Sequence, residues 1–274
     1  MTLVLERTAE PMISVRDVVV SYGGRRVLNG INLDIAHGET MVLLGGSGSG
    51  KSTLLRHIIG LERPQAGRIL VNGVDVASSA QNDLRRVRRS IGVAFQNAAL
   101  FNSMSVGDNV ALPLREHTRL AESTISIMTQ MKLAVVGLAD SANRSPQELS
   151  GGMRKRAAVA RALSLDPEIL VFDEPSAGLD PIVAAEMDEL ILGLKRAFSM
   201  TVLVVTHEMA SAFRIADRMA MLYQGSLIAV GSKEELQSSH HPRIRQFFDR
   251  IPDPFVDVSA IDTFFEQYLK GGFE

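Results

Sequence analysis

The sequence predicts an α/β fold with a largely parallel sheet, because apolar runs of strand length alternate along the chain with stretches of helical period. Several of the runs are continuously apolar, which is typical of strands that are covered on both faces. In the stretches between them, apolar residues recur three or four positions apart, as one buried helix face requires. The strand-like runs are residues 13–22, 40–45, 90–96, 168–174 and 201–207. The helix-like stretches are residues 51–60, 152–165 and 182–198.

Two other parts of the chain complete the expected organisation. Residues 97–163 carry helical patterns and no convincing strand, so we expect a helical insertion there. Residues 221–231 read as two strands around a Gln-Gly pair, and beyond them the pattern weakens. We therefore expect one α/β domain over residues 1–235, with a helical subdomain at about 97–163, followed by a C-terminal extension over residues 236–274.

The composition is that of an ordinary globular protein, and it argues against some partners. The chain has 274 residues, of which 46% are hydrophobic and 22% are charged, so a substantial core is available. Its 29 basic residues are balanced by 31 acidic ones, and the net charge of −2 disfavours nucleic acid as a main partner. No run of about eighteen apolar residues could span a membrane, so we expect a soluble, cytoplasmic protein. Without cysteine, the chain forms no disulfide and no thiolate metal site.

A glycine-rich loop follows the second strand-like run, with the pattern Gly45-x4-Gly50-Lys51-Ser52. That spacing after a strand and before a helix indicates a P-loop rather than a flexible linker, which seldom joins a buried strand to a buried helix. Glycines let successive N–H groups face one anion, and the helix directs its positive dipole end to the same point. Lys51 would lie over the β- and γ-phosphates of a nucleotide, and the Ser52 hydroxyl would ligate Mg²⁺. The expected nucleotide-binding residues are Gly45, Gly46, Ser47, Gly48, Ser49, Gly50, Lys51, Ser52 and Thr53.

Two later apolar runs end in residues that suit nucleotide hydrolysis. The run at 169–172 leads into Asp173 and Glu174. Asp173 would hold the Mg²⁺, and Glu174 would orient and polarise the attacking water. His207 ends the next run, where an imidazole could hydrogen-bond the γ-phosphate. We therefore expect an enzyme that binds and hydrolyses a nucleotide with Mg²⁺, with Lys51, Glu174 and His207 in catalytic roles.

A second anion-binding pattern occurs in the segment Leu149-Ser150-Gly151-Gly152-Met153. Ser150 is a typical N-cap residue, and the N–H groups of the two glycines lie at the start of a helix-like stretch. With this motif about a hundred residues after a P-loop, the chain resembles the ATP-binding subunits of ATP-binding cassette (ABC) transporters. The resemblance covers nearly the whole chain to about residue 235, and its motifs occur in the family's order. Met153 stands where many members have glutamine, which leaves the Ser-Gly-Gly group intact.

The resemblance implies a fold, further site residues and a second copy of the chain. The implied fold is a P-loop NTPase (RecA-like) core with an N-terminal antiparallel β subdomain and an inserted α-helical subdomain. Tyr22 matches the aromatic residue that stacks on adenine, and Gln96 matches the Q-loop glutamine that touches Mg²⁺ and senses the permease. Asp180 belongs to the segment that matches the D-loop. In this family two subunits pair head to tail, so Ser150, Gly151 and Gly152 of one copy would contact the ATP bound by the P-loop of the other.

A closer resemblance concerns the transported substrate. Residues 95–118, 149–163 and 243–253 look like segments of the ATPase subunit of Mla/Mce-type phospholipid transport systems of double-membraned bacteria and plastids. This resemblance implies an integral-membrane permease, an MCE-type substrate-binding protein and a small STAS-domain protein as partners. It also implies a peripheral location on the cytoplasmic face of the inner membrane. An importer ATPase for amino acids or other small solutes, or a regulatory ATPase of the cell-division type, would carry the same catalytic motifs.

Several other features allow less specific interpretations. The arginine-rich residues 85–89 fit a solvated helix face better than a site for lipid or nucleic acid. The basic residues 154–156 oppose the dipole at a helix start, and either a nucleotide phosphate or a permease would be their partner. The apolar residues Leu100, Phe101 and Met104 suit either a permease contact or the core of the helical subdomain.

The C-terminal extension concentrates aromatic residues beyond the expected core. A segment of this length is too short to bury its own aromatic side chains. We expect it either to pack on its own domain or to dock on the other ATPase subunit or an accessory protein. The aromatic residues are Phe247, Phe248, Phe255, Phe264 and Phe265.

Overall fold

The structure is a computed structural model that describes residues 10–252 of the chain. The chain forms two compact units, of which the first ends at Ser238 and the second begins at Ser239. The described part of the second unit contains helix α9 (Pro242–Phe248), in which the rings of Phe247 and Phe248 have centroids 6.5 Å apart. The remaining aromatic residues of the expected docking segment, Phe255, Phe264 and Phe265, lie outside the described residues.

An antiparallel sheet lies near the start of the first unit, as the resemblance implied. Its strands are ordered β2-β1-β4-β5. The first strand matches the predicted run residue for residue, whereas the other three were not predicted. Polar residues interrupt the pattern of β2, and β4 and β5 have only 6 and 2 residues. The strands are β1 (Ile13–Tyr22), β2 (Arg25–Ile35), β4 (Ala66–Val71) and β5 (Val74–Asp75).

The second sheet has six strands in the order β10-β9-β3-β8-β7-β6. Strands β9, β3, β8, β7 and β6 pair in parallel, and β10 pairs antiparallel with β9 across a turn at Gln224 and Gly225, both of which have positive φ. Every residue of β3 and β8 is buried, which confirms that the continuously apolar runs are central strands. The strands are β3 (Thr40–Leu44), β6 (Ile91–Ala94), β7 (Ile169–Asp173), β8 (Thr201–Val205), β9 (Arg218–Tyr223) and β10 (Ser226–Ser232).

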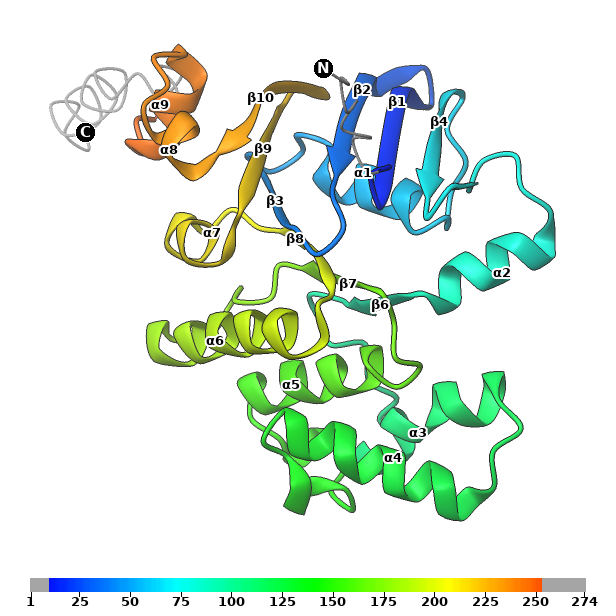
Figure 1. Ribbon diagram of the computed structural model, residues 1–274. Helices are drawn as coiled ribbons and strands as arrows, with labels where there is room; N and C mark the ends of the chain where they lie inside the picture. The colour runs from blue at the N-terminus through cyan, green and yellow to red at the C-terminus, as the bar shows by residue number, and fades with distance from the viewer. Residues whose placement is uncertain (1–9, 253–274) are drawn as a thin grey trace, which may run out of the picture. The chain divides into compact units, whose positions relative to one another are not determined.

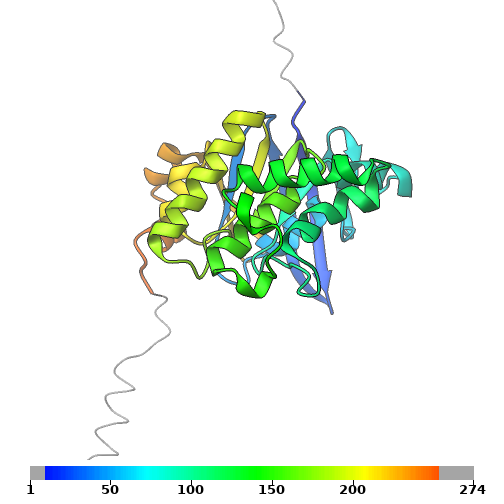
Figure 2. The same ribbon diagram turned by 90° about the horizontal axis from the view of Figure 1, so that it is seen from below.

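Helices cover both faces of the parallel sheet. Figures 1 and 2 show α5 and α6 on one side and α1 with the antiparallel sheet on the other. One continuous apolar core joins β1, β2 and α1 to one face of the parallel sheet. In α2 the side chains of Leu84 and Val87 are buried while the arginines are exposed, so the solvated helix face is confirmed. These helices are α1 (Lys51–Ile58), α2 (Gln81–Arg89), α5 (Gly151–Ala162), α6 (Pro181–Phe198), α7 (Met209–Ile215) and α8 (Lys233–Gln237).

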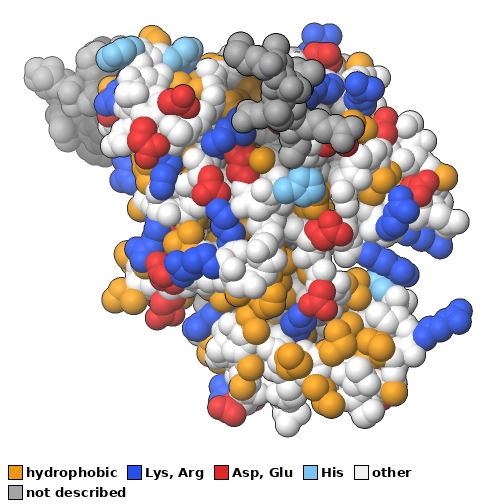
Figure 3. All heavy atoms as spheres, viewed as in Figure 1, with side chains coloured by type: hydrophobic (Ala, Val, Ile, Leu, Met, Phe, Trp, Pro, Cys, Tyr) orange, Lys and Arg blue, Asp and Glu red, His pale blue; other side chains and the backbone are white. Residues whose placement is uncertain are grey.

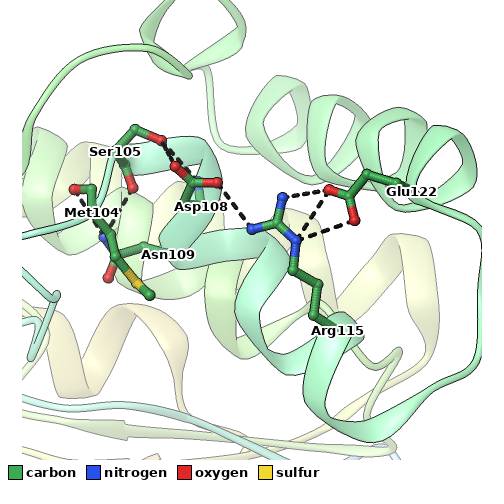
Figure 4. A network of polar contacts seen from close by, with 6 residues as sticks. All are labelled: Met104, Ser105, Asp108, Asn109, Arg115 and Glu122. Atoms are coloured by element: carbon green, nitrogen blue, oxygen red, sulfur yellow. Dashed lines mark hydrogen bonds and ion pairs between the residues drawn. The ribbon is translucent and has the colours of Figure 1, made fainter.

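The stretch that we expected to be helical contains α3 (Val106–His117), α4 (Glu122–Val135) and all of α5. Figure 4 shows how polar contacts join α3 to the start of α4. Arg115 on α3 lies 2.9 Å from the carboxylate of Asp108 on the same helix, and its Nε donates to Glu122 at 3.0 Å. The buried amide of Asn109 accepts from the N–H of Phe101 at 2.7 Å and donates to its carbonyl at 3.0 Å, so it fixes the loop before α3.

The helical insertion also exposes apolar side chains, which gather in the lower part of Figure 3. Ile127, Met131 and Val135 are 64%, 61% and 42% exposed. Because they are four positions apart on α4, they lie along one face of that helix. The apolar residues of α4 therefore lie on two faces of the helix, since Ile125 and Leu133 are buried on the other.

Candidate nucleotide-binding site

The carboxyl ends of four parallel strands meet at one edge of the second sheet (Figure 1). Val205 of β8 pairs with both Leu43 of β3 and Asp173 of β7, and Ala94 of β6 pairs with Phe172 of β7. The segments that leave these strands are the P-loop, the turn with His207, Glu174 and the segment with Gln96. The register of the sheet therefore brings together residues as far apart in the sequence as Gly45 and His207.

The glycine-rich loop is a compact turn attached to the neighbouring strands. Gly45, Gly48 and Gly50 have φ values of 148°, 73° and 109°, which only glycine adopts readily. A Cβ at Gly45 would lie 2.3 Å from the carbonyl oxygen of Leu222, so the backbone of β9 leaves no room for a side chain. The N–H of Gly225 donates to the carbonyl of Ser49 at 3.0 Å. These contacts exclude a flexible linker at this position.

Lys51 begins α1 and lies over this loop. Its Nζ donates to the carbonyls of Gly45 at 2.7 Å and Gly46 at 3.0 Å. Burial lowers the pKa of Lys51, while the carboxylates of Glu174 and Asp173 raise it. A cavity of about 170 Å³ adjoins the lysine, and the buried hydroxyl of Ser49 has no hydrogen-bond partner among residues 10–252. The cavity is lined by Val27, Gly48, Ser49, Gly50, Lys51, Ser52 and Thr53.

Asp173 and Glu174 lie at the end of β7 in different surroundings. Burial and the neighbouring Glu174 raise the pKa of Asp173, whereas Lys51 lowers it. Glu174 has a φ of 51°, a left-handed conformation that is uncommon for a residue other than glycine. Its N–H donates to the carbonyl of Val205 at 2.8 Å, and its Oε2 lies 2.9 Å from Nδ1 of His207. The structure thus pairs the two residues that were expected to act at the γ-phosphate.

The Ser-Gly-Gly group begins α5 as predicted. The hydroxyl of Ser150 accepts from the N–H of Met153 at 3.2 Å and so caps the helix, while Ser150 and Gly151 remain exposed. Gly152 is buried, and a Cβ at this position would lie 2.6 Å from Cγ1 of Val183 on α6. Gly152 therefore has a packing function that its sequence pattern did not show.

Three further residues expected from the resemblance lie at or just beyond the ends of β1, β6 and the loop before α6. The Tyr22 ring at the end of β1 is 44% exposed, and its hydroxyl hydrogen-bonds to Glu62. Gln96 is exposed two residues beyond β6. The carboxylate of Asp180 caps α6, accepting from the N–H groups of Ile182 at 3.0 Å and Val183 at 3.1 Å.

The oxygen donors at this edge suit magnesium. Within residues 10–252, no group of three His, Cys, Asp or Glu side chains could hold a metal ion by itself. Mg²⁺ prefers oxygen ligands and commonly binds through one or two carboxylates together with substrate phosphates. Ser52, Gln96 and Asp173 offer a hydroxyl, an amide oxygen and a carboxylate, a set that fits Mg²⁺ held jointly with a nucleotide.

Sequence comparisons agree with the geometry of this site. A family model described as ABC transporter matches residues 28–177. The chain is 41% identical over 249 residues to the intermembrane phospholipid transport system ATP-binding protein MlaF of Escherichia coli, covering 91% of this chain and 93% of that protein. It is 44% identical over 237 residues to a probable ribonucleotide transport ATP-binding protein, mkl, of Mycobacterium leprae, covering 86% of this chain and 68% of that protein.

Solved structures with the same fold are ATP-binding cassettes. A dimeric post-hydrolysis cassette bound to ADP and Pi superimposes with a TM-score of 0.75 and 30% identity, covering 81% of this chain and 98% of that one. A Clostridium perfringens protein that is part of the ABC transporter complex cbiONQ has a TM-score of 0.78 and 29% identity, covering 88% of this chain and 99% of that one. Across residues 10–252, no helix is both long and apolar enough to cross a membrane.

Proposed function

This chain belongs to the ABC transporter family of ATP-binding proteins, and from that premise we propose that it binds and hydrolyses ATP to drive phospholipid transport between membranes. The observation that carries the proposal is the meeting of the P-loop, Asp173, Glu174 and His207 at one sheet edge. The Ser-Gly-Gly group, which would supply the other half of each ATP site, lies at the start of α5, whereas the P-loop precedes α1. This separation supports a site that a second copy completes.

In the proposed reaction the P-loop holds the phosphates of ATP. Its backbone N–H groups and the positive end of α1 favour the negative charge, and Lys51 would exchange its bonds to Gly45 and Gly46 for phosphate oxygens. Mg²⁺ bound by Ser52, Gln96 and Asp173 would neutralise charge on the phosphates.

Hydrolysis requires an oriented water at the γ-phosphate. The Glu174 side chain is 12% exposed, and the contact with Nδ1 of His207 fixes the orientation of its carboxylate. Glu174 would accept a hydrogen bond from the attacking water, and His207 would donate to the γ-phosphate. Tyr22 would stack on the adenine, and Asp180 would lie near the site of the second copy.

The pairing of two copies would complete each site. Ser150 and Gly151 are exposed at the positive end of α5, where a γ-phosphate bound by another copy could be contacted. One relative in the same fold is a dimeric cassette with ADP and Pi. Closure of the pair on ATP and opening after hydrolysis would drive a membrane partner.

The transported substrate is inferred from the relative that matches over almost its full length. MlaF is described as part of an intermembrane phospholipid transport system, and this chain covers 93% of it. The mycobacterial relative is named for ribonucleotide transport, but the chain covers only 68% of that protein. A permease, an MCE-type substrate-binding protein and a small STAS-domain protein are the partners we propose, at the cytoplasmic face of the inner membrane.

The loop that follows Gln96 is a candidate for the permease contact. The Phe101 side chain is 51% exposed, whereas Leu100 and Met104 are half-buried, so Phe101 is not part of the helical core. The Asn109 side chain holds this loop through hydrogen bonds with the N–H and the carbonyl of Phe101. A rigid loop that presents an exposed aromatic side chain suits a docking surface.

Two active-site variants test the catalytic part of this proposal. Lys51→Ala should abolish productive ATP binding, because it removes the charge over the phosphates. Glu174→Gln should still bind ATP but stall as a closed dimer, which size-exclusion chromatography with ATP would detect. Normal ATP turnover in either variant would contradict the assignment.

A transport assay tests the substrate. The complex that co-purifies with the chain is reconstituted into vesicles, and labelled phospholipid is followed with and without ATP. We expect transfer that requires ATP and is lost with Glu174→Gln. ATP hydrolysis without lipid transfer would instead favour an importer of amino acids or other small solutes, or a regulatory ATPase of the cell-division type.

A further inference from the structure

A lysine near the start of α5 contacts the segment that follows β7. The Nζ of Lys155 donates to the carbonyls of Glu174 at 3.0 Å, Pro175 at 2.9 Å and Ala177 at 2.7 Å. A lysine ammonium has three N–H donors, so each finds an acceptor in this one turn of the backbone. Lys155 is part of α5 and therefore connects the helix that begins at Ser150 to the segment that begins at Glu174.

This location is unfavourable for a lysine unless the contacts compensate for it. Positive charge near a helix start opposes the helix dipole. Burial lowers the pKa of Lys155, and the nearby carboxylates of Glu208 and Glu174 offset only part of this effect. The sequence indicated a nucleotide phosphate or a permease as the partner of this charge, but the structure directs it to three backbone carbonyls of its own chain.

The conformation of Glu174 makes these bonds important for catalysis. A left-handed φ at a residue other than glycine is unfavourable and persists only where surrounding contacts hold it. Glu174 is held by its N–H bond to Val205, by the Lys155 bond to its carbonyl and by the His207 contact to its carboxylate. The backbone conformation of Glu174 sets the direction in which its carboxylate leaves the strand end.

We propose that Lys155 is a positioning residue for hydrolysis: it holds the backbone of residues 174–177 so that Glu174 faces the bound nucleotide. Lys155 thereby links the Ser-Gly-Gly group at the start of α5 to Glu174 at the end of β7 within one chain. This inference rests on the proposed function, because it assigns Lys155 a part in the ATPase reaction.

Substitutions at Lys155 test the inference in ATP hydrolysis assays of the full chain. Lys155→Met keeps an unbranched side chain but removes every donor. Because small displacements of a catalytic group reduce rates strongly, we expect its kcat to fall roughly 10- to 100-fold. The KM for ATP should change little, since the P-loop is untouched. Lys155→Arg, which keeps the charge and the N–H donors, should recover part of the rate.

Lys132→Met is the matched control. Lys132 lies on α4 and has a mostly buried side chain that forms an ion pair with Asp166, so its removal also costs an ammonium contact. Within the described part of the chain, Lys132 forms no hydrogen bond or ion pair with residues 174–177, so the kcat of Lys132→Met should stay within about twofold of the parent. A kcat loss common to Lys155→Met and Lys132→Met would show a general effect of destabilisation and would overturn the inference.

A double variant separates positioning of Glu174 from other effects. If Lys155 acts through Glu174, adding Lys155→Met to Glu174→Gln should reduce the residual hydrolysis no further. Independent, multiplying losses would refute the proposal, as would a normal kcat in Lys155→Met. Should Lys155→Met fail to fold, the same comparison is made with Lys155→Gln, which keeps two N–H donors. Normal turnover in Glu174→Gln alone would instead refute the proposed function.

Discussion

The glycines of the P-loop offer a test of the geometry that distinguishes a phosphate-binding turn from a flexible linker. Three substitutions by alanine differ in what the added Cβ meets. At Gly46 the Cβ would enter open space, and its φ is not in the positive range. At Gly48 the Cβ is also free, but φ is 73°. At Gly45, φ is 148° and the Cβ would lie 2.3 Å from the Leu222 oxygen and 2.7 Å from Oγ of Ser49.

The expected costs follow from these differences. Gly46→Ala should change the free energy of unfolding by less than about 0.5 kcal/mol, as an unstrained surface substitution does. Gly48→Ala should cost about 1–2 kcal/mol, because alanine disfavours a left-handed conformation by that amount. Gly45→Ala carries a similar backbone cost and also forces a carbonyl of β9 to move, which adds about 1–3 kcal/mol. Its total should therefore be roughly 2–5 kcal/mol.

Thermal unfolding without nucleotide measures these costs, since it isolates the loop from ATP binding. For a chain of this size, 1 kcal/mol shifts the midpoint by roughly 2–4 °C, so Gly45→Ala should melt at least about 4 °C below the parent. Urea unfolding should give the same order, with Gly46→Ala nearest the parent. Equal stability of the three variants would refute the reasoning, because it is the result that a mobile linker would give.

Three further predictions concern other parts of the structure. Gly152→Ala should destabilise the fold by about 1–3 kcal/mol because its Cβ would lie 2.6 Å from Val183, whereas Gly151→Ala, whose nearest neighbour is 3.7 Å away, should cost less than about 0.5 kcal/mol in urea unfolding. Burial raises the pKa of Asp188, so the folded chain retains this proton at pH values where the unfolded chain has lost it. Asp188→Asn should therefore raise the urea midpoint at pH 8, with a gain that shrinks as the pH falls through the raised pKa; a gain that increases toward acid pH would contradict the assignment. Deleting residues 253–274 should weaken the assembly measured by light scattering if this segment docks on a partner, and an unchanged complex would exclude docking.

The central sheet could be predicted because its strands are covered on both faces. The runs at 40–45 and 201–207 are continuously apolar, and the structure buries every residue of β3 and β8. Strand β2 and helix α7 were not predicted, for different physical reasons. β2 is exposed on one face and contains Gly30 at a φ of 69°, so its pattern is broken. α7 has only seven residues, too few to show a helical period.

The site could be predicted where its chemistry lies in adjacent residues, and could not where it depends on contacts between distant ones. The P-loop, the Asp173-Glu174 pair and the Ser-Gly-Gly group are local patterns, so spacing and strand order were sufficient to place them. The role of Lys155 depends on three carbonyls about twenty residues away. Every residue has a backbone carbonyl, so the sequence cannot indicate which ones a lysine contacts. The one available signal was a lysine at a helix start, where its charge is unfavourable and a compensating partner is required. An unfavourable charge can therefore show that a contact exists, while only the fold shows which atoms provide it.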